Sequence, residues 1–155
     1  MSATQVQSKK KQIMVIGVLG LATDGKGRFL LTQRNQPEDP EVHLSWQIPG
    51  GGMEFGESPE QTLSREMQEE LGVSVRILYP FPMVKTSTFV LKDKNLHVTL
   101  IAYLVSLDGQ IPKLEDPETK DFQWIDANDV AKLKTLPATD EFVFEAVEIL
   151  KKILM

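Results

Sequence analysis

The most informative segment of this 155-residue chain is Pro49–Val73, which reads PGGGMEFGESPEQTLSREMQEELGV. Its first residues are rich in glycine and predict a tight bend. Ser58 can then cap a helix, Pro59 suits the first helical position, and Gln61 can close a capping box. Gly72 is typical of the residue that ends a helix. The segment therefore predicts a bend followed by a well-capped helix.

Three glutamates on this predicted helix, Glu66, Glu69 and Glu70, are spaced i, i+3 and i+4. Side chains at this spacing lie on adjoining parts of one helix face, here beside an apolar stripe. Gathered carboxylates repel one another, and a bound Mg²⁺ would relieve the repulsion because hard cations prefer oxygen ligands. Taken alone, however, an acidic run on a helix is more often a solvated face. The metal-site interpretation therefore depends on the surrounding residues.

The surrounding residues complete a pattern that resembles the Nudix box. That pattern is Gly, five residues, Glu, seven residues, Arg-Glu, an aliphatic residue, one residue, Glu-Glu, one residue, Gly and an aliphatic residue. The resemblance implies an α/β (α+β) fold, the Nudix-type α/β/α sandwich with a mixed β-sheet, and hydrolysis of a diphosphate linkage in a small nucleotide. Every defined position is filled, by Gly51, Glu57, Arg65, Glu66, Met67, Glu69, Glu70, Gly72 and Val73.

The resemblance also implies a role for the matching residues. The three helical glutamates bind Mg²⁺, or Mn²⁺ in its place, and the Gly50 carbonyl adds a ligand. Arg65 pairs with Glu57 and braces the loop against the helix. A further acidic residue shortly before a late strand often joins the metal site in this family. Glu118 is the best-placed match for it, and Glu115 is the second.

The chemistry requires water to attack a phosphorus that is already surrounded by negative oxygens. Positioning and charge neutralisation therefore carry most of the catalysis, and a bound metal ion supplies both. A carboxylate such as Glu66, Glu69 or Glu118 would take the proton from the water. The sequence leaves the choice among these three open.

Marks of several Nudix subfamilies are absent, which narrows the substrate. Thr88 or Phe89 stands where ADP-ribose enzymes carry a proline, and Val90 and Leu91 replace the tyrosine of dinucleoside polyphosphate hydrolases. The absences favour a MutT-like nucleoside triphosphate pyrophosphohydrolase. A nucleotide-sugar or ADP-ribose pyrophosphatase is the first alternative. A non-catalytic, nucleotide-binding regulatory Nudix domain is the second, but such a domain should have lost a metal carboxylate.

Substrate contacts are expected from Gly51 and Arg34, although Arg34 is explained slightly better as a surface charge at a strand end. In MutT-like proteins a polar residue at the start of the last helix can read the base. Asp140 is the first candidate here and Thr139 the second, and either could instead only cap the helix. Four aromatic residues could stack on a base, although large aromatics in strands are more often core: Trp46, Trp124, Phe89 and Tyr103. His43 and His97 lack metal-ligand spacing and receive no role.

Outside the box, period-two patterns and turn residues predict the remaining elements. Two strands are expected to form a hairpin around a Gly-rich turn, at 13–22 and 28–34. Later strands are expected at 73–77, 84–91, 96–107 and 122–125, with the second and third of these forming a hairpin. A short helix capped by Asp126 and an amphipathic helix at 140–154 would close the chain.

Composition limits the possible classes of protein. With 41% hydrophobic and 25% charged residues, the chain should form one globular domain at 12–155, after a mobile tail at 1–11. The absence of cysteine excludes disulfides and thiolate metal sites and fits a reducing, cytoplasmic location. A net charge of −5 disfavours a nucleic-acid polymer or a membrane as partner. The expected partner is a small nucleotide, and the choice between monomer and homodimer stays open.

Overall fold

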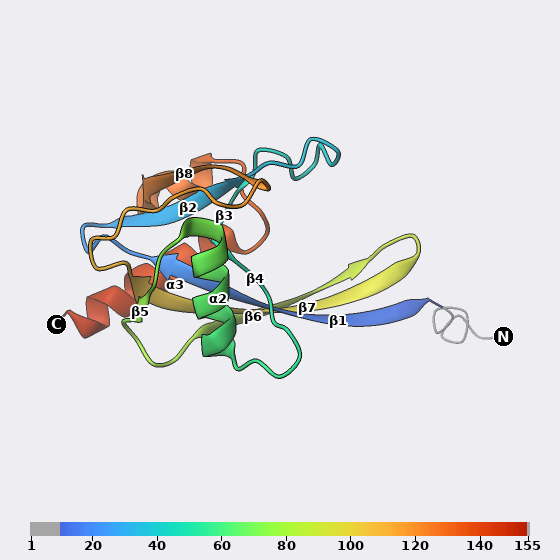
Figure 1. The fold of residues 1–155 in the computed structure, drawn as a ribbon, viewed down its shortest axis with the longest axis horizontal. Coiled ribbons are helices and arrows are strands. Elements are labelled where there is room, and N and C mark those ends of the chain that lie inside the picture. Colours follow the sequence, from blue (N-terminus) through green and yellow to red (C-terminus); the bar gives the residue numbers. More distant parts are fainter. Residues whose placement is uncertain (1–9, 155) are drawn as a thin grey trace.

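The computed structural model describes residues 10–154 of the chain (Figure 1). None of its helices within that range is long and apolar enough to cross a membrane. The elements in chain order are β1 (Lys11–Ala22), β2 (Arg28–Arg34), β3 (Trp46–Gln47), β4 (Gly50–Gly52), α2 (Pro59–Leu71), β5 (Arg76–Ile77), β6 (Met83–Val90), β7 (Lys94–Ser106), β8 (Thr119–Asp126), the 3₁₀ helix η1 (Ala127–Lys132) and α3 (Thr139–Ile153).

The strands form two sheets. The larger sheet is mixed and has the order β4-β1-β7-β5, with β6 paired to β7 beside this path. Its central pair, β1 and β7, is parallel from Lys11 opposite Lys94 to Ala22 opposite Val105, and the other pairs are antiparallel. The smaller sheet has the order β3-β2-β8 and is antiparallel throughout. The expected mixed α/β architecture is therefore confirmed.

The strands expected to form the first hairpin, β1 and β2, belong to different sheets, so that prediction is wrong. An isolated bridge joins Thr23 to Phe29 where the chain reverses between them. The reversal itself is as expected, because Gly25 and Gly27 have positive φ values and Asp24 accepts backbone N–H groups within the turn. Before the turn, β1 pairs along its whole length with β7. This ladder is longer than one with the seven-residue β2 could be.

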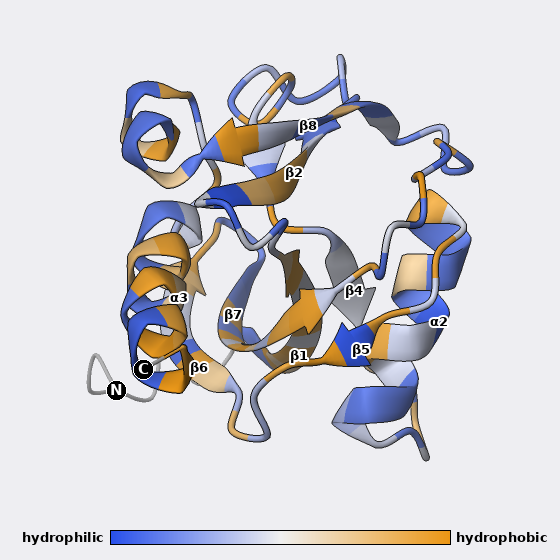
Figure 2. Ribbon diagram, turned by 90° about the vertical axis from the view of Figure 1, so that its left-hand side faces the viewer, coloured by the Kyte–Doolittle hydropathy of each residue, from blue (hydrophilic) through white to orange (hydrophobic). Residues whose placement is uncertain are grey.

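Helix α2 covers one side of the sheets and α3 lies on the opposite side (Figure 2). The apolar stripe of α2, which consists of Leu63, Met67 and Leu71, is buried in a cluster with Val18 of β1. Gly20 of β1 allows this close approach, because a Cβ there would lie 2.9 Å from Leu63 Cδ1 and from Met67 Sδ. The expected apolar face of α2 therefore holds the helix against the larger sheet.

Helix α3 buries Phe142, Val143 and Ala146 in a second cluster that includes Leu21 of β1 and Phe29 of β2. Successive side chains of a strand point to opposite faces, so β1 contributes to both clusters. The two clusters lie on either side of one strand. Strand β4 pairs with β1 at residues 17–19, so the position of β1 determines that of β4.

Several bounds differ from the expected ones. The bend at residues 49–52 contains β4, because its glycines can lie extended against β1. Residues 73–77 contribute only the two-residue β5, and β8 begins at Thr119, earlier than expected. Strand β1 begins at Lys11, inside the expected tail, whose residues 1–9 lie outside the described part. The β6–β7 hairpin and the Asp126 cap of η1 are confirmed.

Candidate active site

Helix α2 carries most of the candidate residues, and its caps determine where it begins and ends. Ser58 Oγ accepts the N–H of Gln61 at 3.2 Å, and the Gln61 side chain accepts the N–H of Ser58 at 2.8 Å. Gly72 ends the helix in the left-handed conformation, with a φ of 63°. The predicted capped helix is therefore confirmed, and it presents its acidic face to the glycines of β4.

Arg65 joins this helix to the preceding loop. Its Nε and Nη2 donate to the two carboxylate oxygens of Glu57 at 2.8 and 2.9 Å, and Nη2 also donates to the Gly52 carbonyl at 3.0 Å. The bonds from Arg65, the largest influence, lower the pKa of Glu57 to about 2. The pairing implied by the resemblance is thus present in the structure, and it braces residues 52–57 against the helix.

The same guanidinium also reaches two of the helical glutamates. Arg65 Nη1 lies 2.8 Å from Glu66 Oε1 and 3.3 Å from Glu69 Oε2. The Glu66 carboxylate lies against Gly51, since a Cβ there would be 2.5 Å from its Cδ and 2.6 Å from both oxygens. The Glu69 side chain is 62% exposed, whereas that of Glu66 is 18% exposed. Two carboxylates therefore share one cationic group, and Gly51 leaves room for one of them, that of Glu66.

Glu70 faces the interior and is only 4% exposed. Its carboxyl group accepts the Gly50 N–H at 3.1 Å and the hydroxyls of Thr32 and Thr119 at 3.3 Å each. Burial raises the pKa of Glu70 to about 7, because the ionised form is the one that loses water. The charge of Asp116 raises it further, while the three hydrogen bonds oppose the shift. Glu70 is thus a carboxyl that titrates near neutral pH beside the backbone of β4.

The donor set can be compared with the needs of a divalent metal ion. Within residues 10–154, no three acidic or histidine side chains converge on one point. Glu70 turns inwards to its hydrogen-bond donors, while Glu66 and Glu69 face Arg65. The chemistry of the set nevertheless fits such an ion, because it offers three carboxylates and two of them already attract a single cation.

The two later acidic candidates lie on the loop before β8. Glu118 is exposed, its N–H donates to Asp116 Oδ1 at 2.9 Å, and its carbonyl accepts the N–H of Asn35 at 2.7 Å. Glu115 lies at the end of α2, where its Oε1 would be 2.8 Å from a Cβ on Gly72. A metal-ligand role for Glu118 or Glu115 stays a prediction.

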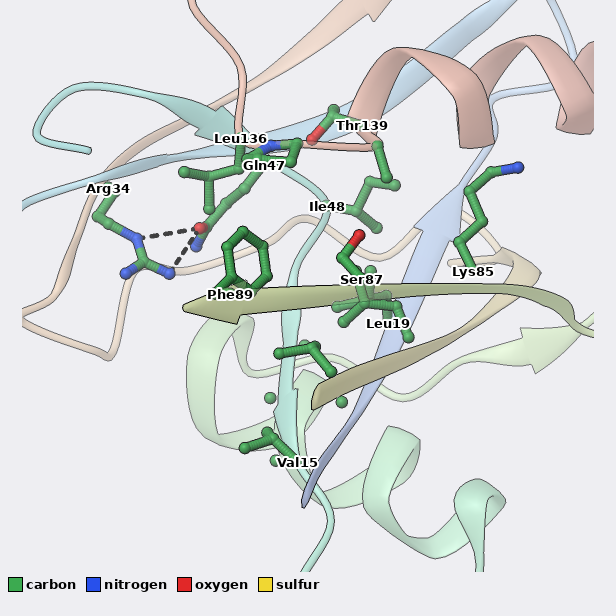
Figure 3. A pocket seen from close by; sticks show the side chains of 18 residues that line it. Val15, Leu19, Arg34, Gln47, Ile48, Lys85, Ser87, Phe89, Leu136 and Thr139 are labelled. Atoms are coloured by element: carbon green, nitrogen blue, oxygen red, sulfur yellow. Dashed lines mark hydrogen bonds between the residues drawn. The ribbon is translucent and has the colours of Figure 1, made fainter. Parts of the chain in front are cut away.

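A cavity of about 290 Å³ opens beside β4 (Figure 3). Gly50 and Gly51 line it, and these residues also contact Glu70 and Glu66. The cavity therefore begins where the carboxylates are. Its walls are mainly apolar and come from β1, β6, β7 and the residue after β3, with side chains from Val15, Leu19, Ile48, Phe89, Val98 and Leu100.

Only some of the predicted substrate-binding residues line this cavity. Arg34 and Thr139 line it, whereas Asp140 lies outside the lining and accepts the N–H of Glu141 at 2.9 Å. Neither Thr139 nor Asp140 caps α3. The N-cap is Ala138, with a φ of 72° and no side-chain hydrogen bond, so the capping interpretation is wrong. The helix begins one residue earlier than expected, which places Thr139 at the cavity.

The four aromatic residues proposed to stack on a base also differ in their positions. Tyr103 is 3% exposed in the core, and its hydroxyl donates to Glu60 at 2.8 Å. Trp46 and Trp124 are partly buried against the two core clusters. Phe89 is 38% exposed and lines the cavity (Figure 3). Three of the four are therefore packing residues, and Phe89 is placed to contact a ligand.

Comparison with known proteins agrees with this geometry. A family model described as the NUDIX domain matches residues 14–146, which includes α2, β4 and all the residues that line the cavity. The chain belongs to the Nudix family. Its relatives include an 8-oxo-dGTP diphosphatase from Proteus vulgaris, which is 33% identical over 101 residues, or 65% of this chain and 81% of the relative.

Other Nudix relatives are similar. The Mycobacterium tuberculosis H37Rv protein named putative 8-oxo-dGTP diphosphatase 2 is 33% identical over 109 residues, covering 70% of this chain and 72% of its own length. The crystal structure of the MutT protein from Methanosarcina mazei Go1 superposes with a TM-score of 0.67 at 26% identity, covering 93% of this chain and 98% of that one. The chain is thus a MutT-like member of this family of pyrophosphohydrolases.

Several residues around the Nudix box were not predicted. Thr32 and Thr119 hold Glu70, and Gln47 accepts two bonds from Arg34. Thr32 could have been noticed, because it is a polar residue that directly continues the apolar run of β2. Gln47 had no such signal, since its role depends on a strand pairing that brings it beside Thr32 of β2.

Proposed function

We propose that this Nudix protein hydrolyses a nucleoside triphosphate to the nucleoside monophosphate and pyrophosphate, with Mg²⁺ or Mn²⁺. One observation carries the proposal: Gly50 and Gly51 line the cavity and also touch the carboxyl groups of Glu70 and Glu66. A nucleotide with its base in the cavity would therefore have its phosphates beside the acidic face of α2. The names of two relatives, both 8-oxo-dGTP diphosphatases, support a triphosphate substrate.

In this proposal Glu66, Glu69 and Glu70 would hold the metal ion, with the Gly50 carbonyl as a further ligand. When bound, the ion neutralises phosphate charge and acidifies a water molecule. Arg65 holds the loop that carries Gly52, so that β4 keeps its place relative to the helix. Arg34 would contact phosphate or sugar from the cavity wall.

The direct experiment is a panel of substrates incubated with Mg²⁺, followed by analysis of the products. The panel contains the common nucleoside triphosphates, 8-oxo-dGTP, nucleotide sugars and ADP-ribose. The proposal expects monophosphate and pyrophosphate from at least one triphosphate, and no reaction in excess EDTA. If only nucleotide sugars or ADP-ribose react, the triphosphate assignment is wrong.

The alternative of a non-catalytic regulatory domain is tested by the same panel. Such a domain would bind nucleotide and release no product from any member of the panel. All three helical glutamates of the Nudix box are present in this chain, which favours catalysis over that alternative.

A further inference from the structure

The polar groups that line the cavity are unevenly distributed between hydrogen-bond donors and acceptors. Arg34, Lys85 and Gln47 line it together with two hydroxyl residues, Ser87 and Thr139, and its lining contains no carboxylate within the described part of the chain. Two of the five side chains are therefore cationic and can only donate hydrogen bonds. Such a lining favours a ligand edge that carries acceptors.

The two cations have different surroundings. Lys85 Nζ lies 3.4 Å from Glu145 Oε2 and 3.8 Å from Glu141 Oε2, and it points towards α3 (Figure 3). Its charge is therefore balanced on that side. Arg34 is held by two neutral amides, since Nη1 donates to Gln36 Oε1 at 3.0 Å and the other nitrogens donate to Gln47. The charge of Arg34 is not neutralised by these partners.

The contact with Arg34 also fixes the direction of the Gln47 amide. Gln47 Oε1 accepts from Arg34 Nε at 3.1 Å and from Nη2 at 3.0 Å, and Figure 3 shows this amide between Arg34 and the ring of Phe89. The reversed amide would place its NH₂ group against two N–H donors. The oxygen is therefore committed to Arg34, and the NH₂ group is the part that Gln47 can offer to a ligand.

We infer that Gln47, oriented by Arg34, is a specificity-determining residue that selects a nucleobase with a carbonyl edge over the corresponding base with an amino edge. The inference rests on the proposed function, because it assumes that the base occupies the cavity. Its physical basis is that an amino group facing the Gln47 NH₂ leaves two donors opposed and unpaired. Mismatched buried polar groups give large discrimination between otherwise similar substrates.

The test uses two substrate pairs in which an oxo group beside a protonated ring nitrogen replaces an amino group beside an unprotonated one, inosine against adenosine triphosphate and uridine against cytidine triphosphate. The wild-type protein should favour the carbonyl member of each pair by at least about tenfold in kcat/KM. Gln47→Glu keeps an acceptor for Arg34 and removes the NH₂ donor, so both ratios should fall to about one or invert. Equal rates within the pairs for the wild type, or unchanged ratios in Gln47→Glu, would overturn the inference.

Gln36→Glu is the matched control, because Gln36 accepts from the same arginine and lies outside the cavity lining. It adds the same negative charge beside Arg34 and leaves the Gln47 donor in place, so the ratios should persist. If the two ratios also fell to about one in Gln36→Glu, the added negative charge alone would explain the preference. That result would contradict the role of Gln47.

A binding measurement separates this inference from the proposed function. Calorimetry with inosine and adenosine monophosphates needs no turnover, and the inosine ligand should bind the wild type at least about tenfold more tightly. If no triphosphate is hydrolysed and this preference is present, the proposed hydrolysis fails and the inference stands. If triphosphates are hydrolysed and both monophosphates bind equally, the inference fails and the proposed function stands.

Discussion

At the scale of single residues, Glu70 shows how much of the site depends on distant parts of the chain. Its three hydrogen-bond donors come from β2, β4 and β8, which are far apart in the sequence. Buried carboxyl groups need such donors, because an unpaired buried charge is very costly. The spacing on α2 placed Glu70 on the acidic face, but its burial follows from the three strands around it.

The raised pKa of Glu70 predicts a pH dependence of stability in the metal-free protein. The unfolded chain loses this proton near the ordinary value of 4.5, whereas the folded protein holds it up to about 7. Stability is therefore lost as pH rises from 4.5 to 7. The difference between the two pKa values corresponds to roughly 3 kcal/mol.

Denaturant unfolding at pH 5 and pH 8 in EDTA measures this effect, with Glu70→Gln as the comparison. The wild type should lose more stability than the variant between the two pH values. The comparison is needed because other carboxyls also titrate, and Glu57, whose pKa is lowered, loses its stabilising contribution only as pH falls below 4.5. A parallel pH dependence in the two proteins would show that Glu70 has an ordinary pKa.

Gly51 gives a second prediction at this scale. A Cβ at this position would displace the Glu66 carboxylate, which is the flexible end of a side chain, so Gly51→Ala should change the folding stability by no more than about 1 kcal/mol. Turnover should fall about a hundredfold, since misplacing a reacting group by about 1 Å has effects of that size. Gly52→Ala is the control, because a Cβ there meets nothing within 4 Å. Equal turnover in the two variants would show that catalysis does not depend on the position of the Glu66 carboxylate beside Gly51.

At the scale of elements, α2 was predictable because its signals are local. Ser58, Gln61 and Gly72 act within the helix they delimit, and the structure shows each of them as expected. The β6–β7 hairpin was predictable for the same reason. The supposed β1–β2 hairpin failed because a turn determines where a chain reverses but does not determine which strand a neighbour pairs with. The partner of β1 is β7, more than seventy residues further along the chain.

The capping box of α2 gives a prediction for the element. Ser58→Ala removes the acceptor of the Gln61 N–H and should lower the free energy of unfolding by about 1 kcal/mol. Ser64→Ala is the matched control, since Ser64 lies on the exposed side of the same helix and alanine favours helix there. Chemical denaturation measures both variants. If Ser64→Ala lowered the free energy of unfolding as much as Ser58→Ala, the capping hydrogen bond would not be the cause of the loss.

At the scale of the whole molecule, the fold class and the Nudix family could be predicted because the box alone contains nine defined positions. The shape of the cavity could not, because it is built from β1, β3, β6, β7 and the start of α3. The position of Arg34 at a strand end makes it a candidate from sequence alone, whereas its partner Gln47 is identified only when β2 and β3 are paired. Substrate preference depends on such contacts between segments, so it is the least predictable property from sequence.

Metal-dependent hydrolysis should depend on the acidic face of α2. The most direct measurement is the initial rate of triphosphate hydrolysis as a function of Mg²⁺ concentration, in the wild type and in Glu69→Gln. Glu69 is 62% exposed, so the variant should fold normally, as its denaturation midpoint will show. Turnover should fall at least about a hundredfold, equivalent to roughly 2.7 kcal/mol in the barrier, while Glu148→Gln on α3 should keep full activity. Wild-type turnover in Glu69→Gln, with an unchanged dependence on Mg²⁺, would exclude a metal-binding role for Glu69.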